Sequence, residues 1–233
     1  MKAILRSGFL ALAIMLALAV PANAGPFEDG LAAAERGDYT TALKYWQPLA
    51  EQGNAKLQFT VGLIYYNGRG VPQDHAEAAK WFRLAANQGV TEAQLKLGLI
   101  YDAGRSVPQD YAEAAKWYRI AAEKGNATAQ FNLGVLYAKG DGVPQDAAES
   151  VMWYRKAAEQ GYAMAQNNLG VLYAIGEGVP QDNVSAHIWF NLAAAQGHRK
   201  AQDGREIVAE RRTPDQIDES QRMTREWLEK HQQ

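Results

Sequence analysis

The sequence Val71-Pro72-Gln73-Asp74 is the first of four identical copies, which occupy residues 71–74, 107–110, 143–146 and 179–182. Each copy follows the one before it by 36 residues. A fixed period of this length is typical of supersecondary units that stack and contact only their neighbours. The repetition therefore predicts a solenoid rather than a globule with one central core.

An α-helix is predicted to begin at the aspartate of each copy. Three copies have glutamate three residues later: Asp74 with Glu77, Asp110 with Glu113, and Asp146 with Glu149. This is the capping-box spacing, in which aspartate accepts hydrogen bonds from first-turn amides and glutamate reaches back to the amide of the cap residue. Asp182 is followed by Ser185, so we expect that cap without its reciprocal half. The proline before each cap keeps the incoming chain extended.

The residues after each cap predict an amphipathic helix with one apolar stripe. Apolar side chains recur at steps of three and four. They are Ala78, Trp81, Phe82, Ala85; Ala114, Trp117, Tyr118, Ala121; Ser150, Trp153, Tyr154, Ala157; and Ala186, Trp189, Phe190, Ala193. Each helix is expected to end near a glycine, which tolerates the left-handed turn after a C-terminus. A shorter copy begins at Asp38.

A second helix per repeat carries a glycine at a fixed position. These glycines are Gly62, Gly98, Gly134 and Gly170. A glycine inside a helix costs about 1 kcal/mol relative to alanine, so its return in four copies indicates a packing role. We expect it to let the two helices of one repeat approach closely against alanines, while the aromatic residues fill the space between repeats.

Together these residues resemble the Sel-one-like repeat, a short relative of the tetratricopeptide repeat. The shared pattern is Ala-Gln-x-x-Leu-Gly-x-x-Tyr, then Gly-x-Gly-Val-Pro-Gln-Asp, then Ala-x-x-Trp-(Tyr/Phe) and Ala-Ala-x-x-Gly. The resemblance covers residues 38–209 and implies an all-α fold, a right-handed α/α superhelix whose members usually act as adaptors for protein complexes. In one copy Ser106 replaces the second loop glycine, which is expected to stiffen or reshape that loop.

We therefore expect an α/α superhelical solenoid of 36-residue helix-turn-helix repeats with capping helices at both ends. About five repeats would occupy residues 38–212. The N-terminal capping helix would occupy residues 25–37, and the C-terminal one residues 213–233. In the last segment Ile217, Thr224, Trp227 and Leu228 form a narrow apolar stripe suited to covering the last repeat. Capped ends argue against end-to-end polymerisation, so we expect a monomer.

Residues 1–24 predict a cleaved secretory signal peptide. Lys2 and Arg6 give a positive start, residues 9–20 are an uncharged apolar run, and Ala-Asn-Ala at 22–24 fits signal peptidase. An uncleaved anchor is the alternative, but a membrane span needs about 20 apolar residues and this run is shorter. We expect a periplasmic protein with no membrane span after cleavage.

Composition narrows the class of partner. The chain has no cysteine, so packing alone must hold an exported product together, which favours a bacterial periplasm over an animal extracellular module. Loss of Lys2 and Arg6 moves the formal net charge from −2 to −4. A mildly acidic chain without a basic run is a poor candidate for nucleic acid, because that binding depends on Lys and Arg at phosphates.

The sequence contains no recognisable catalytic or metal-binding motif. His-Glu-x-x-His, Ser-x-x-Lys and Gly-x-Ser-x-Gly are missing, and the four histidines are scattered. The repeated aspartates and glutamates already have a role in helix capping, so they do not suggest an acid/base pair. We expect no enzymatic activity, no cofactor and no metal.

The candidate partner-binding residues are those that vary on the capped helices, together with a row of arginines available for carboxylates. They are His75, Arg83, Tyr111, Arg119, Arg155, Asn183 and His187. The structural alternative is that these are ordinary exposed positions.

The predicted function is that of a non-catalytic scaffold or adaptor that binds protein or peptide in the bacterial cell envelope. The resemblance also implies an alternative, a cell-wall-related enzyme or ligand-binder, since one branch of the family binds or hydrolyses β-lactams. That branch has a disulfide in each repeat, whereas this chain has no cysteine. A structural protein associated with peptidoglycan is a further alternative.

Overall fold

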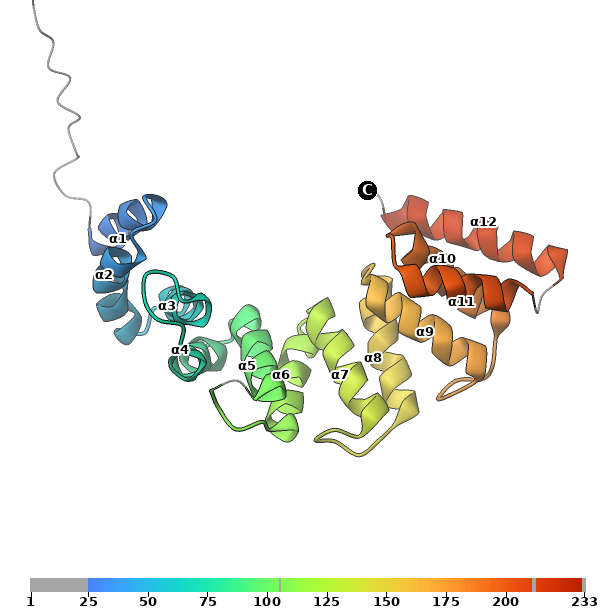
Figure 1. Cartoon of the computed structure of the whole chain (residues 1–233), viewed down its shortest axis with the longest axis horizontal. Helices are drawn as coiled ribbons and strands as arrows, with labels where there is room; N and C mark the ends of the chain where they lie inside the picture. The colour runs from blue at the N-terminus through green and yellow to red at the C-terminus, as the bar shows by residue number, and fades with distance from the viewer. Residues whose placement is uncertain (1–24, 105, 211–212, 232–233) are drawn as a thin grey trace, which may run out of the picture.

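The computed structural model describes residues 25–104, 106–210 and 213–231, and the signal peptide expected at residues 1–24 lies outside them. Within these ranges the chain is all helical. The helices are α1 (Pro26–Glu35), α2 (Tyr39–Glu51), α3 (Ala55–Asn67), α4 (His75–Asn87), α5 (Thr91–Ala103), α6 (Tyr111–Glu123), α7 (Ala127–Lys139), α8 (Ala147–Glu159), α9 (Ala163–Ile175), α10 (Asn183–Ala195), α11 (Arg199–Ala209) and α12 (Pro214–His231). They stack in sequence order along an arc whose two ends rise on the same side (Figure 1). The predicted all-α solenoid is confirmed.

Two kinds of helix alternate along the arc. We call α2, α4, α6, α8 and α10 the capped helices, because an aspartate precedes each of them, and α3, α5, α7 and α9 the glycine helices. Each glycine helix packs most extensively on the capped helix that follows it. No helix in the described ranges is both long enough and apolar enough to cross a membrane.

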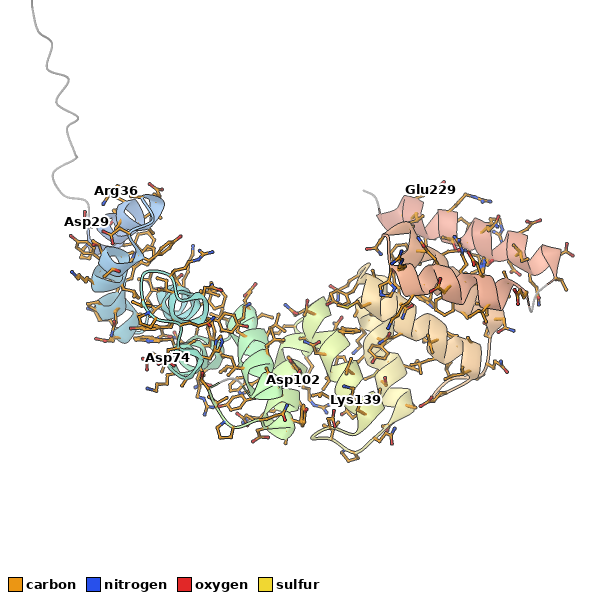
Figure 2. The ribbon with its side chains drawn as sticks, viewed as in Figure 1. Asp29, Arg36, Asp74, Asp102, Lys139 and Glu229 are labelled. Atoms are coloured by element: carbon orange, nitrogen blue, oxygen red, sulfur yellow. The ribbon has the colours of Figure 1, made fainter. Side chains whose placement is uncertain are left out.

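The aspartate caps form as predicted, but the reciprocal glutamate half of the capping box is wrong. Asp74 lies in the loop before α4 (Figure 2), and its Oδ1 accepts hydrogen bonds from the amides of Ala76 and Glu77, each at 2.9 Å. The amide of Asp74 donates instead to the carbonyl of Tyr65 at 3.0 Å. In the other three copies the aspartate amide also donates to the carbonyl of the tyrosine nine residues earlier. The glutamates are therefore released for other contacts.

The glutamine of the repeated sequence also has a structural partner. Gln73 Nε2 donates to the carbonyl of Tyr66 at 2.8 Å, which supplies a partner to one of the last carbonyls of α3. Gln109, Gln145 and Gln181 repeat this contact seven residues back, at distances of 2.7, 2.9 and 2.8 Å. The proline, glutamine and aspartate of the repeated sequence thus all serve the connection between two helices.

The helical glycines make room for an aromatic ring, which corrects the expected packing against alanines. A Cβ at Gly98 would lie 2.4 Å from the ring of Tyr118, and one at Gly134 would lie 2.8 Å from the ring of Tyr154. The other glycine helices face Phe82 and Phe190 in the same way. Each ring comes from the capped helix that follows, so the close contact joins a glycine helix to its successor.

Candidate partner-binding face

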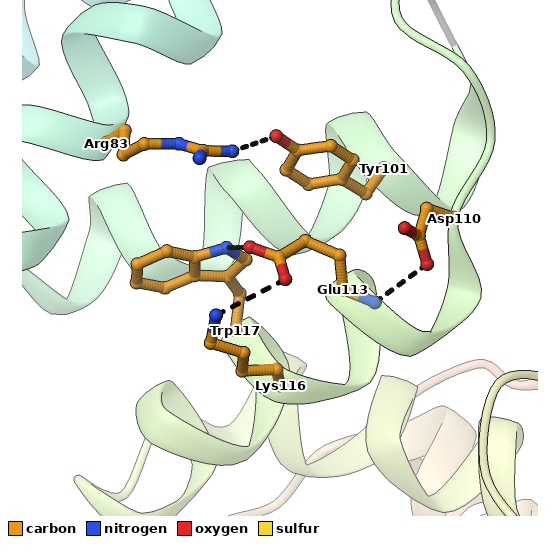
Figure 3. Close-up of polar contacts among 6 residues, drawn as sticks. All are labelled: Arg83, Tyr101, Asp110, Glu113, Lys116 and Trp117. Atoms are coloured by element: carbon orange, nitrogen blue, oxygen red, sulfur yellow. Dashed lines mark hydrogen bonds and ion pairs between the residues drawn. The ribbon is translucent and has the colours of Figure 1, made fainter.

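The three arginines predicted to bind a partner lie on one side of consecutive capped helices. Arg83 donates to the hydroxyl of Tyr101 (Figure 3), and its guanidinium carbon lies 5.7 Å from the ring centre. Arg119 pairs in this way with Tyr137, and Arg155 with Tyr173, where the guanidinium carbons lie 5.6 and 5.9 Å from the ring centres. We call the side of α4, α6 and α8 that carries these arginines the open face.

Each arginine is therefore held in place and still able to bind. A guanidinium has five N–H donors, and the tyrosine hydroxyl takes one of them. Arg83 and Arg155 are exposed, and Arg119 is half-buried. A planar guanidinium fixed against a ring loses little freedom when it meets a carboxylate, which is the partner its geometry fits best.

The structure places His75 inside the solenoid rather than on an open surface. Its side chain is 8% exposed, and its ring lies 4.8 Å from that of Tyr66. Its Nδ1 is buried without a hydrogen-bond partner in the described part of the chain. His75 is the first residue of α4 and points back toward the preceding glycine helix α3. The variation of this position between repeats therefore reflects local packing.

His187 is also buried, at 3% exposure, because α12 covers it. The Ser220 hydroxyl lies 2.8 Å from His187 Nδ1, and the Asn191 side-chain amide lies 3.0 Å from the same nitrogen. Asn191 also donates to the Thr224 hydroxyl at 3.5 Å. His187 and Asn191 occupy the positions that Val151 and Arg155 occupy in α8, so α12 lies on the continuation of the open face.

The remaining two candidates lie at helix starts. Tyr111 is half-buried, and its hydroxyl accepts a hydrogen bond from Gln109 at 2.9 Å. Asn183 is also half-buried, and its Oδ1 is shielded from solvent. Of the seven candidates, the structure brings together only the three arginines on an accessible surface, and partner binding by any of the seven stays a prediction.

Two hollows adjoin Arg83 on the open face. One, of about 530 Å³, is lined by Lys80, Leu84 and Tyr101 among others. The other, also about 530 Å³, lies between α4 and α6 and is lined by Trp117 and Lys124. Sequence reasoning missed these hollows, because the walls of each come from different helices.

The glutamate freed from the capping box organises the hollow between α4 and α6. Glu113 accepts hydrogen bonds from the indole Nε1 of Trp117 at 2.8 Å and from Lys116 at 3.3 Å, while its own amide donates to Asp110 (Figure 3). Glu149 and Trp153 repeat the indole contact at 3.1 Å. At α6 this contact fixes the Trp117 ring as one wall of the hollow between α4 and α6.

Ionisable groups elsewhere in the described ranges have structural roles. Burial and the hydrogen-bonded Asp102 carboxylate raise the pKa of Tyr118, and burial raises the pKa of Tyr154. No group of three or more acidic or histidine side chains comes together as a metal site in that part of the chain. The arrangement is suited to binding through fixed cations and apolar hollows.

Comparison with known proteins agrees with this architecture. The Sel1 repeat family matches residues 22–54, 55–90, 91–126, 127–162 and 163–198. The first match includes α1 and α2, so the family pattern counts α1 as part of a repeat. Each of the others joins a glycine helix to the capped helix that follows it, the same pairs that pack most extensively here.

Solved structures show the same fold. One is c5321, a protective antigen of uropathogenic Escherichia coli with an SLR fold, at 34% identity and a TM-score of 0.76 over 88% of this chain. This chain spans 45% of that protein. Another is a Sel1 repeat protein from Oxalobacter formigenes, at 34% identity and a TM-score of 0.69, covering 74% of this chain and 71% of that one.

A curated relative gives a shorter match. The rat protein DAP3-binding cell death enhancer 1 is 50% identical over 38 residues, which is 16% of this chain and 8% of the relative. That match has the length of about one repeat and bears on the repeat rather than on the whole protein. The five repeat matches and the shared solenoid fold show that the chain belongs to the Sel1 repeat family.

Proposed function

We propose that this chain is an exported, non-catalytic scaffold of the bacterial cell envelope that binds a protein or peptide along the open face. Sel1 repeats generally bind proteins, and the fold is an extended solenoid with a long accessible surface. The observation that carries the proposal is the row of three arginines. Each is fixed on a tyrosine, and neighbouring ones lie one repeat apart on consecutive capped helices.

The end of the chain supports this choice of face. The helix α12 lies on α10 at the positions equivalent to the arginine row, so the solenoid already accepts one helix there. On α4, α6 and α8 the same positions carry Ala or Val beside Arg. The Ala or Val itself is buried, so a partner would meet the arginines together with exposed apolar neighbours such as Leu84 and Met152, which suits a segment that carries both apolar and acidic side chains.

Export and the envelope location rest on the signal-like sequence of residues 1–24. The similar E. coli chain is a protective antigen, which agrees with an exported protein. Fractionation of cells that express the full chain should recover a shortened product beginning near Gly25 in the periplasmic fraction. Recovery of the unprocessed chain from the cytoplasm would contradict this part of the proposal.

Replacement of the three arginines tests the binding face. Arg83, Arg119 and Arg155 should be changed together to Gln, the residue that α2 carries at the equivalent position 47. Capture of envelope proteins by the immobilised chain should fall, while helical circular dichroism stays the same. Arg69→Gln is the matched control, because Arg69 lies 5.4 Å over the Tyr39 ring but belongs to a loop. Equal capture by the triple variant and the control would reject the arginine row.

A further inference from the structure

Pairs of glutamines, one buried and one exposed, join a glycine helix to the end of the capped helix that follows it at three places. The glutamine just after each of these capped helices donates from its Nε2 to the Oε1 of a glutamine in the glycine helix directly before that capped helix. The pairs are Gln88 with Gln58 at 2.7 Å, Gln160 with Gln130 at 2.7 Å, and Gln196 with Gln166 at 2.8 Å. In each pair the buried glutamine donates its own Nε2 to a backbone carbonyl, so both ends of its amide are satisfied.

The fourth such place, between α5 and the end of α6, lacks this pair. Lys124 stands where the others have glutamine, and its Nζ donates to the carbonyl of Gly89 at 2.8 Å. Gln94 is 2% exposed and still donates to Ala86 at 3.0 Å, but its Oε1 has no hydrogen-bond partner in the described part of the chain. A buried acceptor without a donor is costly, so this site gains from any ligand that brings an N–H group.

The unpaired glutamine borders the hollow between α4 and α6. Gln94 and Lys124 line this space of about 530 Å³ together with Arg83, Lys116 and Trp117. The hollow is large enough for several residues of an extended peptide, and its Trp117 wall is fixed by Glu113. The unsatisfied acceptor, the lysine that replaces its usual partner and an accessible cavity thus coincide at one place.

Charge also distinguishes this hollow from its equivalents. Its lining carries Arg83, Lys116 and Lys124 against Glu113, a formal charge of +2. The residues 36 positions earlier give −1, and those 36 and 72 positions later give zero. Part of the difference comes from Asn87, where the other three copies have glutamate: Glu51, Glu123 and Glu159. The hollow between α4 and α6 therefore favours an anion that the other three do not.

We propose that the hollow between α4 and α6 binds an acidic peptide segment. A peptide carboxylate lies against Lys124, Lys116 and Arg83, and a backbone N–H donates to Gln94 Oε1 as the Lys124 side chain turns from the Gly89 carbonyl to the ligand. An ammonium group has three donors, so Lys124 can hold a carboxylate through a charge-assisted bond. This inference rests on the proposed function and names the chemistry of its partner at one repeat.

A labelled model peptide tests the site directly. The probe is a fluorescein-labelled peptide of alternating Glu and Gly, and its uncharged counterpart has Gln in place of Glu. Fluorescence anisotropy with the full chain should show binding of the acidic peptide, weaker binding as salt is raised, and little binding of the uncharged one. Lys124→Gln, which restores the glutamine pair, should raise Kd about tenfold while the melting temperature does not fall.

Lys139→Gln is the matched control, because Lys139 is an exposed lysine at the end of α7 that lines neither hollow beside Arg83. It should leave Kd unchanged. Equal binding by wild type and Lys124→Gln, or equal binding of the two peptides, would overturn the site. Complete displacement of the labelled peptide by millimolar inorganic phosphate would show that the site binds a simple anion, and would overturn the proposal of a peptide ligand.

The two proposals fail in different ways. If envelope proteins are captured through the arginine row but the acidic peptide does not bind, only this inference is rejected. If the peptide binds at Lys124 but the triple arginine variant captures envelope proteins as well as wild type, the wider binding face is rejected and this site stands.

Discussion

The row of equivalent positions 83, 119, 155 and 191 is covered by α12 at one end of the solenoid and accessible along the rest. On α10, His187 and Asn191 bind Ser220 and Thr224 of α12. On α4, α6 and α8 the equivalent positions hold Ala or Val beside an arginine fixed on tyrosine. Ser220 and Thr224 are four residues apart on α12, as their partners His187 and Asn191 are on α10. The two helices therefore run side by side in the same direction. The comparison shows that this row of positions can carry a packed helix.

The scaffold beneath the covered and open regions should be the same, and a glycine substitution gives the largest expected effect. Gly134→Leu would drive a side chain into the Tyr154 ring and lower the free energy of unfolding by about 3 kcal/mol. Gly170→Leu should cost a similar amount against Phe190, because a Cβ at either glycine lies 2.8 Å from the ring. Urea unfolding followed by circular dichroism measures both.

Leucine at Lys139, an exposed position on the same helix as Gly134, is the control and should leave stability almost unchanged. A stable Gly134→Leu protein would refute the ring contact. A large loss in only one of the two glycine variants would show that the scaffold differs between the regions.

High pH should loosen the open region first. Tyr118 and Tyr154 lie on α6 and α8, where α4 and α10 carry phenylalanine, and burial raises the pKa of both above the ordinary 10.0. A raised pKa in the folded state means that the neutral hydroxyl stabilises the fold below pH 10 and that this stabilisation is lost as pH rises further. Stability in urea should therefore stay level from pH 8 to pH 10 and fall as the pH rises above 10.

The double variant Tyr118→Phe and Tyr154→Phe should lose less stability over that range than wild type. Tyr45→Phe, at an exposed tyrosine, serves as control and should behave as wild type does. The same alkaline loss in the double variant would show that other groups cause it.

Detachment of α12 should be possible without harm to the other repeats. Ser220→Ala removes the hydroxyl that meets the buried His187 and should weaken the docking of α12 by about 2 kcal/mol. Hydrogen exchange should quicken in α12 and stay unchanged in α4, α6 and α8. Unchanged exchange in α12 would mean that its apolar stripe alone holds it.

The smallest effect is expected in the loop after α5. Ser106 has a φ of +57°, whereas the equivalent Gly70, Gly142 and Gly178 have values of +70°, +67° and +68°. A side chain in this left-handed region is strained, so Ser106→Gly should raise stability by about 0.5 kcal/mol, a gain limited by the greater freedom of glycine in the unfolded chain. A loss of stability on thermal unfolding would show that the serine side chain has a positive role.

The sequence predicted local structure well because its causes are local. The caps at Asp74 and its equivalents, the apolar stripes and the covering segment of Ile217, Thr224, Trp227 and Leu228 depend on spacings within one helix. Contacts between helices were predicted less well. Nothing in the spacing of Gly98 shows that the Tyr118 ring lies on it, and nothing near Glu113 shows that its carboxylate turns from the cap to an indole.

The candidate site was only partly predictable for the same reason. The arginine row repeats at 36 residues and could be recognised. The burial of His75 and His187 could not, because it depends on the preceding glycine helix in one case and on α12 in the other. The sequence shows that Lys124 replaces a glutamine found in the other repeats. Only the structure shows that this replacement leaves Gln94 Oε1 without a hydrogen-bond donor in the described part of the chain.

The central claim is that partners bind the open face of the capped helices, and site-directed photo-crosslinking in cells tests it most directly. A photoreactive benzoylphenylalanine should replace Leu84 or Met152 on the capped helices of the open face, or Met164 or Val171 on the glycine helix α9. These four positions are comparably exposed, at 46%, 37%, 44% and 41%, so accessibility does not bias the result. The account predicts discrete adducts with an envelope protein from Leu84 and Met152 alone. Adducts from Met164 and Val171, with none from the open face, would contradict it.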